Sequence, residues 1–375
     1  MFRTSRILLT LTLALTTFPL LSHAQDSRTS GAVFVMTNNA TQNGVIAYDR
    51  YADGSLSKQG VFASGGRGSG GLTDPLTSQG SLLLTDDHSF LLAANAGSGD
   101  ISVFRVSGAN LALVGVTPCG GSEPVAVAQH GHLVYVANAG GTSNVTGFRL
   151  SGYGQLAPIA HSTTFLTTAS AGPGSVAFSP DGKILLVTEK STGNIDAFPV
   201  NADGTLGTLV TNPSAGPGLF GVLFAPNGTA IATETGPAGA TDASAVSSYA
   251  VSASGTLTVI SASVPTLANA TCWHVVTPNG KWLYTTNPGS GTLSGFSVSA
   301  SGALAAIDGT VLATLPTGST DLDLAISSDG KYLYTIDSGT GSVSVLSVNS
   351  DGTLTVQTGV SGLPVEAGFN GIAAY

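Results

Sequence analysis

The chain has 375 residues, of which 50 are glycine and only 9% are charged, and its formal net charge is −9. This composition is typical of many short strands joined by tight turns, because glycine accepts positive φ and β-branched residues suit a pleated surface. The acidic balance and the scattered Lys and Arg residues argue against a nucleic-acid or anionic membrane surface, since both need a basic patch.

The first 24 residues have the three parts of a secretory signal peptide. Arg3 and Arg6 precede an apolar run over residues 7–15, and Ser22-His23-Ala24 provides a small-residue cleavage site. No second apolar stretch of spanning length follows, so a transmembrane anchor is not expected. We therefore expect an exported protein, secreted or periplasmic, whose folded part is residues 25–375.

One unit recurs along the rest of the chain, and its fullest copies span residues 172–206, 272–304 and 321–354. Each copy consists of an apolar strand (A), an Asp-Gly or Asn-Gly hairpin turn, and a strand ending in Asn, Asp or Glu (B). An alternating strand (C) and a turn into a fourth strand (D) follow. Four antiparallel strands make one blade of a β-propeller.

The number of residues that end a strand B gives the number of blades. Such a residue occurs seven times, as Asn38, Asn95, Asn138, Glu189, Glu234, Asn287 and Asp337. The first blade lacks its own strand A, whereas residues 368–375 form a strand-like segment without a partner. We therefore predict an all-β, seven-bladed propeller in a single domain, closed by the C-terminal strand and self-contained as a monomer.

The strings VMTN (35–38), YVAN (135–138) and YTTN (284–287), with SPDG or TPNG turns before strand B, resemble the lactonase-family propellers. This family includes 6-phosphogluconolactonase and carboxymuconate cyclase relatives. The resemblance covers essentially all of residues 25–375. It implies a seven-bladed fold, a small-molecule substrate and hydrolysis of a lactone.

The fourth blade departs from the family pattern. Phosphogluconolactonase-like members open strand A with Gly-Pro-Arg-His and end strand B with Asn-Glu. Here the first segment is Gly172-Pro173-Gly174-Ser175, so the Arg and His are absent, while Glu189 stands where the family has Glu. A phosphorylated lactone needs a cation to hold its anionic group, so a neutral sugar lactone is the favoured substrate.

The end of strand B lies beside the start of strand A in an antiparallel blade, so the seven B-end residues should form a ring on one face. Glu189 and Glu234 come from adjacent blades, and two carboxylates close together raise one pKa and create a general acid or base. His274, beside Trp273 at the start of a strand A, is a second candidate base. In the alternative interpretation each B-end residue only caps a strand by bonding a neighbouring loop amide.

The remaining candidates are expected to bind substrate or metal. Substrate-binding candidates on this face are Lys190, Arg67, Asn138, Asn287, Asp337 and Trp273. No cofactor is expected, although oxygen ligands from several blades are the set that calcium prefers. Cys119 and Cys272 should lie across the ring from each other and remain separate, mostly buried thiols.

Three functions remain open on the sequence. In a lactone hydrolase, Glu189 would activate water with help from Glu234 or His274. A non-catalytic binding propeller would use the acidic mouth to hold a ligand, and a cell-envelope scaffold would do neither.

Overall fold

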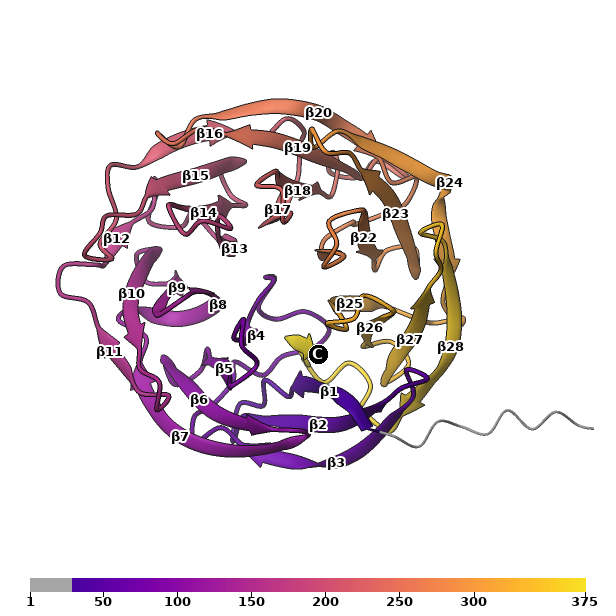
Figure 1. The fold of residues 1–375 in the computed structure, drawn as a ribbon, viewed down its shortest axis with the longest axis horizontal. Coiled ribbons are helices and arrows are strands. Elements are labelled where there is room, and N and C mark those ends of the chain that lie inside the picture. Colours follow the sequence, from indigo (N-terminus) through magenta and orange to yellow (C-terminus); the bar gives the residue numbers. More distant parts are fainter. Residues whose placement is uncertain (1–28) are drawn as a thin grey trace, which may run out of the picture.

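The computed structural model describes residues 29–375, so the predicted signal peptide lies outside the described residues. The described part forms seven antiparallel sheets arranged as a ring (Figure 1). The predicted all-β, seven-bladed propeller with four strands per blade is therefore confirmed. No helix in residues 29–375 is long and apolar enough to cross a membrane.

The blades follow the chain, and each runs from an innermost to an outermost strand. Blades 1 to 3 consist of β29 (Ile372–Ala374), β1 (Thr29–Met36), β2 (Gly44–Tyr51) and β3 (Leu56–Ala63); β4 (Leu82–Leu84), β5 (Phe90–Asn95), β6 (Asp100–Ser107) and β7 (Asn110–Pro118); and β8 (Ser122–His130), β9 (Leu133–Gly140), β10 (Asn144–Leu150), β11 (Leu156–Pro158) and β12 (Thr164–Phe165). In blade 3, β11 and β12 both pair with β10, so its outer strand is broken in two.

Blades 4 to 7 repeat the same order. They consist of β13 (Pro173–Phe178), β14 (Ile184–Glu189), β15 (Asn194–Pro199) and β16 (Val210–Pro213); β17 (Leu219–Phe224), β18 (Ala230–Glu234), β19 (Ala245–Val251) and β20 (Leu257–Pro265); β21 (His274–Val276), β22 (Trp282–Asn287), β23 (Thr292–Val298) and β24 (Leu304–Thr314); and β25 (Asp321–Ile326), β26 (Tyr332–Asp337), β27 (Ser342–Val348) and β28 (Leu354–Ser361).

The C-terminal strand closes the ring. β29 pairs antiparallel with β1, with Val33 opposite Ala374 and Val35 opposite Ile372. The prediction that residues 368–375 supply the missing inner strand of the first blade is confirmed. The two ends of the described chain thus share one sheet, which removes an open edge.

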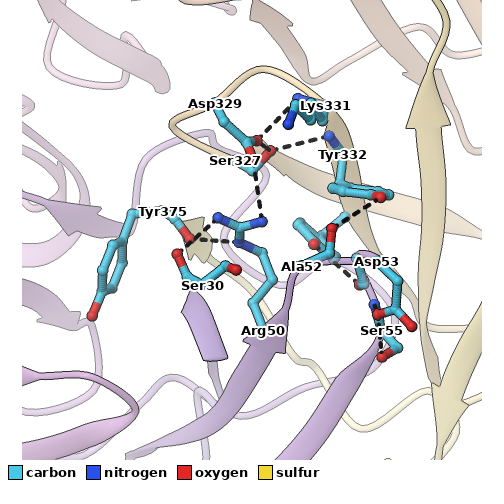
Figure 2. A network of polar contacts seen from close by, with 12 residues as sticks. Ser30, Arg50, Ala52, Asp53, Ser55, Ser327, Asp329, Lys331, Tyr332 and Tyr375 are labelled. Carbon is cyan, nitrogen blue, oxygen red and sulfur yellow. Dashed lines mark hydrogen bonds and ion pairs between the residues drawn. The ribbon is translucent and has the colours of Figure 1, made fainter. Parts of the chain in front are cut away.

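A buried arginine secures this closure (Figure 2). Arg50 is 2% exposed; its Nε donates to the carbonyl oxygen of Tyr375 at 2.8 Å and its Nη2 donates to that of Ser30 at 3.0 Å. Nη1 lies 3.6 Å from Oδ2 of Asp329 in the β25–β26 turn. One side chain therefore joins blade 1, the closing strand and blade 7.

The tyrosine of the repeat string also joins neighbouring blades. The hydroxyl of Tyr135 donates to the carbonyl oxygen of Gly204 at 2.8 Å, and that of Tyr284 donates to Gly352 at 2.8 Å. Each acceptor belongs to the turn between the third and fourth strands of the next blade. The repeat needs glycine there, because φ of Gly352 is +86° and a Cβ would lie 2.7 Å from the Trp282 ring.

The apolar core is divided among the contacts between blades. In one cluster Leu92 and Val103 of blade 2 pack with Val134 and Phe148 of blade 3. Cys119 belongs to this cluster, whereas Cys272 belongs to the cluster around blades 6 and 7. Both cysteines are buried and free, as expected.

Candidate functional site

A loop between blades 1 and 2 crosses the middle of the ring. Residues 72–80, here called the channel segment, lie beside β4 near the centre of Figure 1. Ser78 Oγ donates to the carbonyl oxygen of Val125 in blade 3 at 2.8 Å. The main-chain amide of Gln79 donates to the carbonyl oxygen of Gly174 in blade 4 at 2.8 Å. Trp273 Nε1 of blade 6 donates to the carbonyl oxygen of Ser78 at 2.8 Å. The channel segment therefore bridges blades on opposite sides of the ring.

Thr77 in this segment holds two ionisable side chains. Its amide donates to Oδ1 of Asp74 at 3.0 Å, and its carbonyl oxygen accepts a hydrogen bond from Nζ of Lys190 at 2.6 Å. Asn370 Nδ2 also donates to Oδ1 of Asp74 at 2.7 Å, and Lys190 donates to the carbonyl oxygen of Pro173 at 3.2 Å. Thr77 has a φ of 45°, a strained value for a β-branched residue, and such strain is concentrated at functional sites.

The pKa values of both ionisable groups are shifted toward neutral pH. Burial raises the pKa of Asp74 to about 6, although Asn370, Thr77 and Lys190 oppose the rise. Burial lowers the pKa of Lys190 to about 8, and the Asp74 charge opposes the fall. Near pH 7 the carboxylate is therefore ionised and the amine protonated, while both side chains remain partly exposed. A carboxylate and an ammonium group with pKa values on either side of pH 7 thus lie beside Thr77, and groups of this kind suit general base and acid catalysis.

Lys190 comes to this place because it directly follows the end of β14, at the predicted site face. Its ammonium also lies 5.8 Å from the centre of the Phe220 ring. The family Arg has no room here, because a Cβ on Gly174 would lie 2.1 Å from the carbonyl oxygen of Phe220. Lys190 and the channel segment thus contact Pro173 and Gly174, in the stretch where this chain departs from the family pattern.

The ring of B-end residues is present but closed to solvent. All seven side chains are at most 1% exposed. Asn138 Nδ2 donates to Asn144 Oδ1 at 3.0 Å, Asn287 Oδ1 accepts from Thr271 Oγ1 at 2.5 Å, and Asp337 Oδ2 accepts from Ser319 Oγ at 2.6 Å. These contacts support the capping interpretation for the three residues rather than direct contact with a substrate.

The two glutamates of the ring bind separate sets of donors. Glu189 accepts hydrogen bonds from the amide of Thr167 at 2.7 Å and from Thr192 Oγ1 at 2.6 Å. Glu234 accepts bonds from the Gly216 amide at 2.9 Å and from Ser247 Oγ at 2.7 Å. Their partners do not overlap, so the expected meeting of the two carboxylates is absent from these contacts.

The carboxyl group coupled to Glu189 is instead Asp196 on β15 of the same blade. Burial raises the pKa of Asp196 to about 8, and Glu189 adds to the rise. Burial also acts to raise the pKa of Glu189, but hydrogen bonds from Thr167, Thr192 and Asp196 outweigh it and hold that pKa below its usual value. At neutral pH Asp196 is therefore protonated while Glu189 is ionised.

His274 points away from the channel, whereas Trp273 faces it. His274 is fully buried, with Nε2 3.0 Å from the carbonyl oxygen of Ile231 in blade 5, and burial lowers its pKa to about 4. Trp273 bonds the channel segment and packs edge-on against Phe220, with ring centres 5.0 Å apart. The buried, neutral imidazole of His274 therefore packs between blades 5 and 6.

Two further predictions concern Arg67 as a substrate-binding residue and the B-end oxygens as calcium ligands. Arg67 is exposed on the loop before the channel segment, and its main-chain amide donates a hydrogen bond to Ser98 Oγ at 2.8 Å. No group of three or more His, Cys, Asp or Glu residues within 29–375 could hold a metal ion. Most B-end oxygens bond hydroxyl and amide donors of their own blade, of the neighbouring blade or of the loop between blades, so they do not fit a shared calcium ion.

Two hollows on the surface lie away from Asp74 and Lys190. One of about 350 Å³, between blades 7 and 1, has an uncharged lining that includes Gln42, Val61 and Phe369. The other, of about 390 Å³, lies at the turns of blades 4 and 5 and contains Asp181 and Lys183, whose charged atoms are 3.2 Å apart. Neither hollow contains a paired base and acid that are both shifted toward neutral pH.

Asp74 and Thr77 were missed from the sequence because they belong to no repeat. The one available indication was the interval between Asn38 and Asn95, the largest between consecutive B-end residues. An insertion between the first two blades follows from it, but its path into the channel depends on contacts with blades 3, 4 and 6.

The fold defines a seven-bladed propeller in which Asp74 and Lys190 both bond the main chain of Thr77. The family model described as "Lactonase, 7-bladed beta-propeller" matches residues 42–162, 125–224 and 245–363, so the chain belongs to this family. A comparison with curated proteins finds no significant match.

Solved structures share the fold at low identity. A putative 6-phosphogluconolactonase from Bacteroides uniformis is 21% identical with a TM-score of 0.70, covering 92% of this chain and 99% of that one. One from Bacteroides fragilis is 19% identical with a TM-score of 0.68, covering 96% and 99%. The periplasmic gluconolactonase of Pseudomonas aeruginosa is 18% identical with a TM-score of 0.65, covering 90% and 99%.

Proposed function

We propose that this protein hydrolyses an uncharged sugar lactone, with Asp74 as the general base and Lys190 as the general acid. The observation that carries the proposal is the contact of both side chains with the main chain of one residue, Thr77. Membership of the lactonase family and the likeness to gluconolactonase-type propellers support the same reaction. The buried, fully bonded Glu189 favours Asp74 over Glu189 as the base.

The reaction needs one proton accepted and one donated. Asp74 takes a proton from water as the water oxygen attacks the lactone carbonyl carbon, and Lys190 stabilises the negative charge that develops on the oxygen. The ring C–O bond then breaks, and Lys190 gives its proton to the leaving alkoxide. The product is an open-chain hydroxy acid, and proton exchange with solvent restores both residues.

The charge of the site supports a neutral substrate. Lys190 is already bonded to two carbonyl oxygens and is accompanied by Asp74, so it is poorly placed to neutralise a phosphate. Gly174 and Ser175 occupy the positions where family members have Arg and His. A phosphorylated lactone would therefore lack the cations that usually bind such a group.

The test is hydrolysis of neutral and phosphorylated lactones, corrected for spontaneous hydrolysis. We expect turnover of a neutral lactone, and we expect Asp74→Asn and Lys190→Met each to lower kcat by about 10²-fold or more. Lys183→Met is the matched control, because Lys183 is exposed on an A–B turn. Turnover of none of the lactones would overturn the proposal.

A non-catalytic binding propeller is the second candidate. It is favoured by the use of all seven B-end residues in the interior of the protein. Saturable binding of a sugar or lactone without turnover would support it.

We also propose that the protein is exported, on the basis of residues 1–24. Sequencing the N-terminus of the protein recovered outside the cytoplasm tests this, with cleavage before Gln25 as the expected result. Recovery of the full-length chain in the cytoplasm alone would contradict it.

A further inference from the structure

Glu123 is an exposed carboxylate at the start of β8 in blade 3. Its φ is 55°, a left-handed value that a residue with a long side chain rarely adopts. The residue lies just before the point where β8 changes register, between Pro124 and Ala126. The fold thus holds an exposed charged residue in a strained conformation, an arrangement that is concentrated at binding and catalytic sites.

Glu123 and Lys190 belong to neighbouring blades that both contact the channel segment. Ser78 bonds the carbonyl oxygen of Val125, two residues beyond Glu123, and Lys190 bonds the carbonyl oxygen of the adjacent Thr77. The negative charge of Glu123 acts on Lys190 and, with Asp74, opposes the burial that lowers the Lys190 pKa. The charges of two carboxylates, Asp74 and Glu123, therefore act on the one ammonium group of Lys190.

We infer that Glu123 sets the charge preference of the site, admitting an uncharged lactone and expelling the anionic hydroxy acid formed from it. This inference rests on the proposed function. A neutral lactone meets no repulsion from Glu123, whereas ring opening creates a carboxylate beside two others. Like charges at short range repel, so Glu123 weakens product binding and rejects a phosphorylated lactone.

The test measures binding of the product class without relying on turnover. The affinities of D-gluconate and 6-phosphogluconate are measured by calorimetry at pH 7 and low ionic strength, for the wild type and Glu123→Gln. We expect the substitution to tighten gluconate binding by about 3- to 10-fold and 6-phosphogluconate binding by more. Added salt should reduce the difference.

Two further variants separate charge from conformation. Glu123→Gly removes the charge and relieves the positive φ, so it should tighten gluconate binding as Glu123→Gln does. Glu366→Gln is the matched control, because Glu366 is also an exposed glutamate with positive φ, at 48°, on the loop before β29. It should leave both affinities unchanged.

The outcomes distinguish this inference from the proposed reaction. Equal gluconate affinity in the wild type and Glu123→Gln, an equal effect of Glu366→Gln, or no gluconate binding to either protein would overturn the role of Glu123. Failure of the wild type to hydrolyse any lactone would overturn the reaction, and the gluconate affinities would still decide what Glu123 does. If turnover is found, the product inhibition constant of gluconate should fall in Glu123→Gln by the same factor as its dissociation constant.

Discussion

The carbonyl oxygen of Thr77 lies 2.6 Å from Nζ of Lys190, and the amide of the same residue lies 3.0 Å from Oδ1 of Asp74. The main chain of one residue therefore fixes the proposed acid and the proposed base relative to each other. The Thr77 side chain has no part in either contact. What the site requires at this position is a backbone conformation with positive φ rather than a threonine.

Thr77→Gly should therefore preserve activity. Glycine keeps both main-chain contacts and adopts a φ of 45° without strain, so we expect kcat to change by less than about 2-fold and the free energy of unfolding by less than about 1 kcal/mol. Thr77→Pro removes the amide donor and forces φ to about −65°, so it should lower kcat by about 10-fold or more. Steady-state kinetics with thermal unfolding curves provides the comparison, and equal activity of the two variants would count against the role of the Thr77 main chain.

The proposed reaction predicts a bell-shaped pH dependence. Activity requires ionised Asp74 and protonated Lys190, so kcat/KM should rise as pH increases through about 6 and fall as it passes about 8. In Lys190→Arg the decline near pH 8 should disappear, because a guanidinium stays protonated there. Initial rates from pH 5 to 9 test this, and a flat profile in the wild type would contradict the assignment.

The propeller could be predicted from the sequence because its repeat is local. The turns, the alternating strands and the B-end residues each occur within about 35 consecutive positions, and the closing strand follows from counting strands. The site could not be predicted in the same way. Asp74 meets Asn370, and Gln79 donates to the carbonyl oxygen of His274, so these contacts join residues far apart in the chain without a periodic pattern.

The glutamates show a different limit of sequence reasoning. The sequence predicts their place at the end of strand B, but the hydroxyl groups that bond them come from other strands and from loops within and between blades. Ser247 on β19 bonds Glu234, and Thr192 bonds Glu189. Serine and threonine are so frequent in this chain that no pattern marks those that reach a buried carboxylate.

Asp196→Asn should change how stability depends on pH. Because the pKa of Asp196 is raised to about 8 in the folded protein, its contribution is fully present below the unfolded pKa of about 4 and is lost as pH rises from there toward 8. Asparagine stays uncharged at every pH, so it carries no buried charge as the pH rises. We expect the variant to gain stability relative to the wild type between pH 5 and 8, by up to about 1.4 kcal/mol per pH unit.

Urea denaturation at several pH values measures this difference. Asp323, whose pKa burial also raises to about 8, contributes the same slope to both proteins and cancels in the comparison. A difference that stays constant from pH 5 to 8 would show that Asp196 does not carry the proton.

Arg50→Met should weaken the closure of the ring before it affects the rest of the propeller. The substitution leaves the carbonyl oxygens of Tyr375 and Ser30 without their buried donor and Asp329 without its ion pair, so we expect a loss of about 2–4 kcal/mol in the free energy of unfolding. Hydrogen exchange should quicken first in β29 and β1, because the arginine contacts this sheet directly. Tyr284→Phe removes a hydrogen bond between blades 6 and 7 instead, so it serves as a control that should cost about 1 kcal/mol without selective exchange in β29. Uniform acceleration over all seven blades in Arg50→Met would mean that the arginine supports the fold generally rather than its closure.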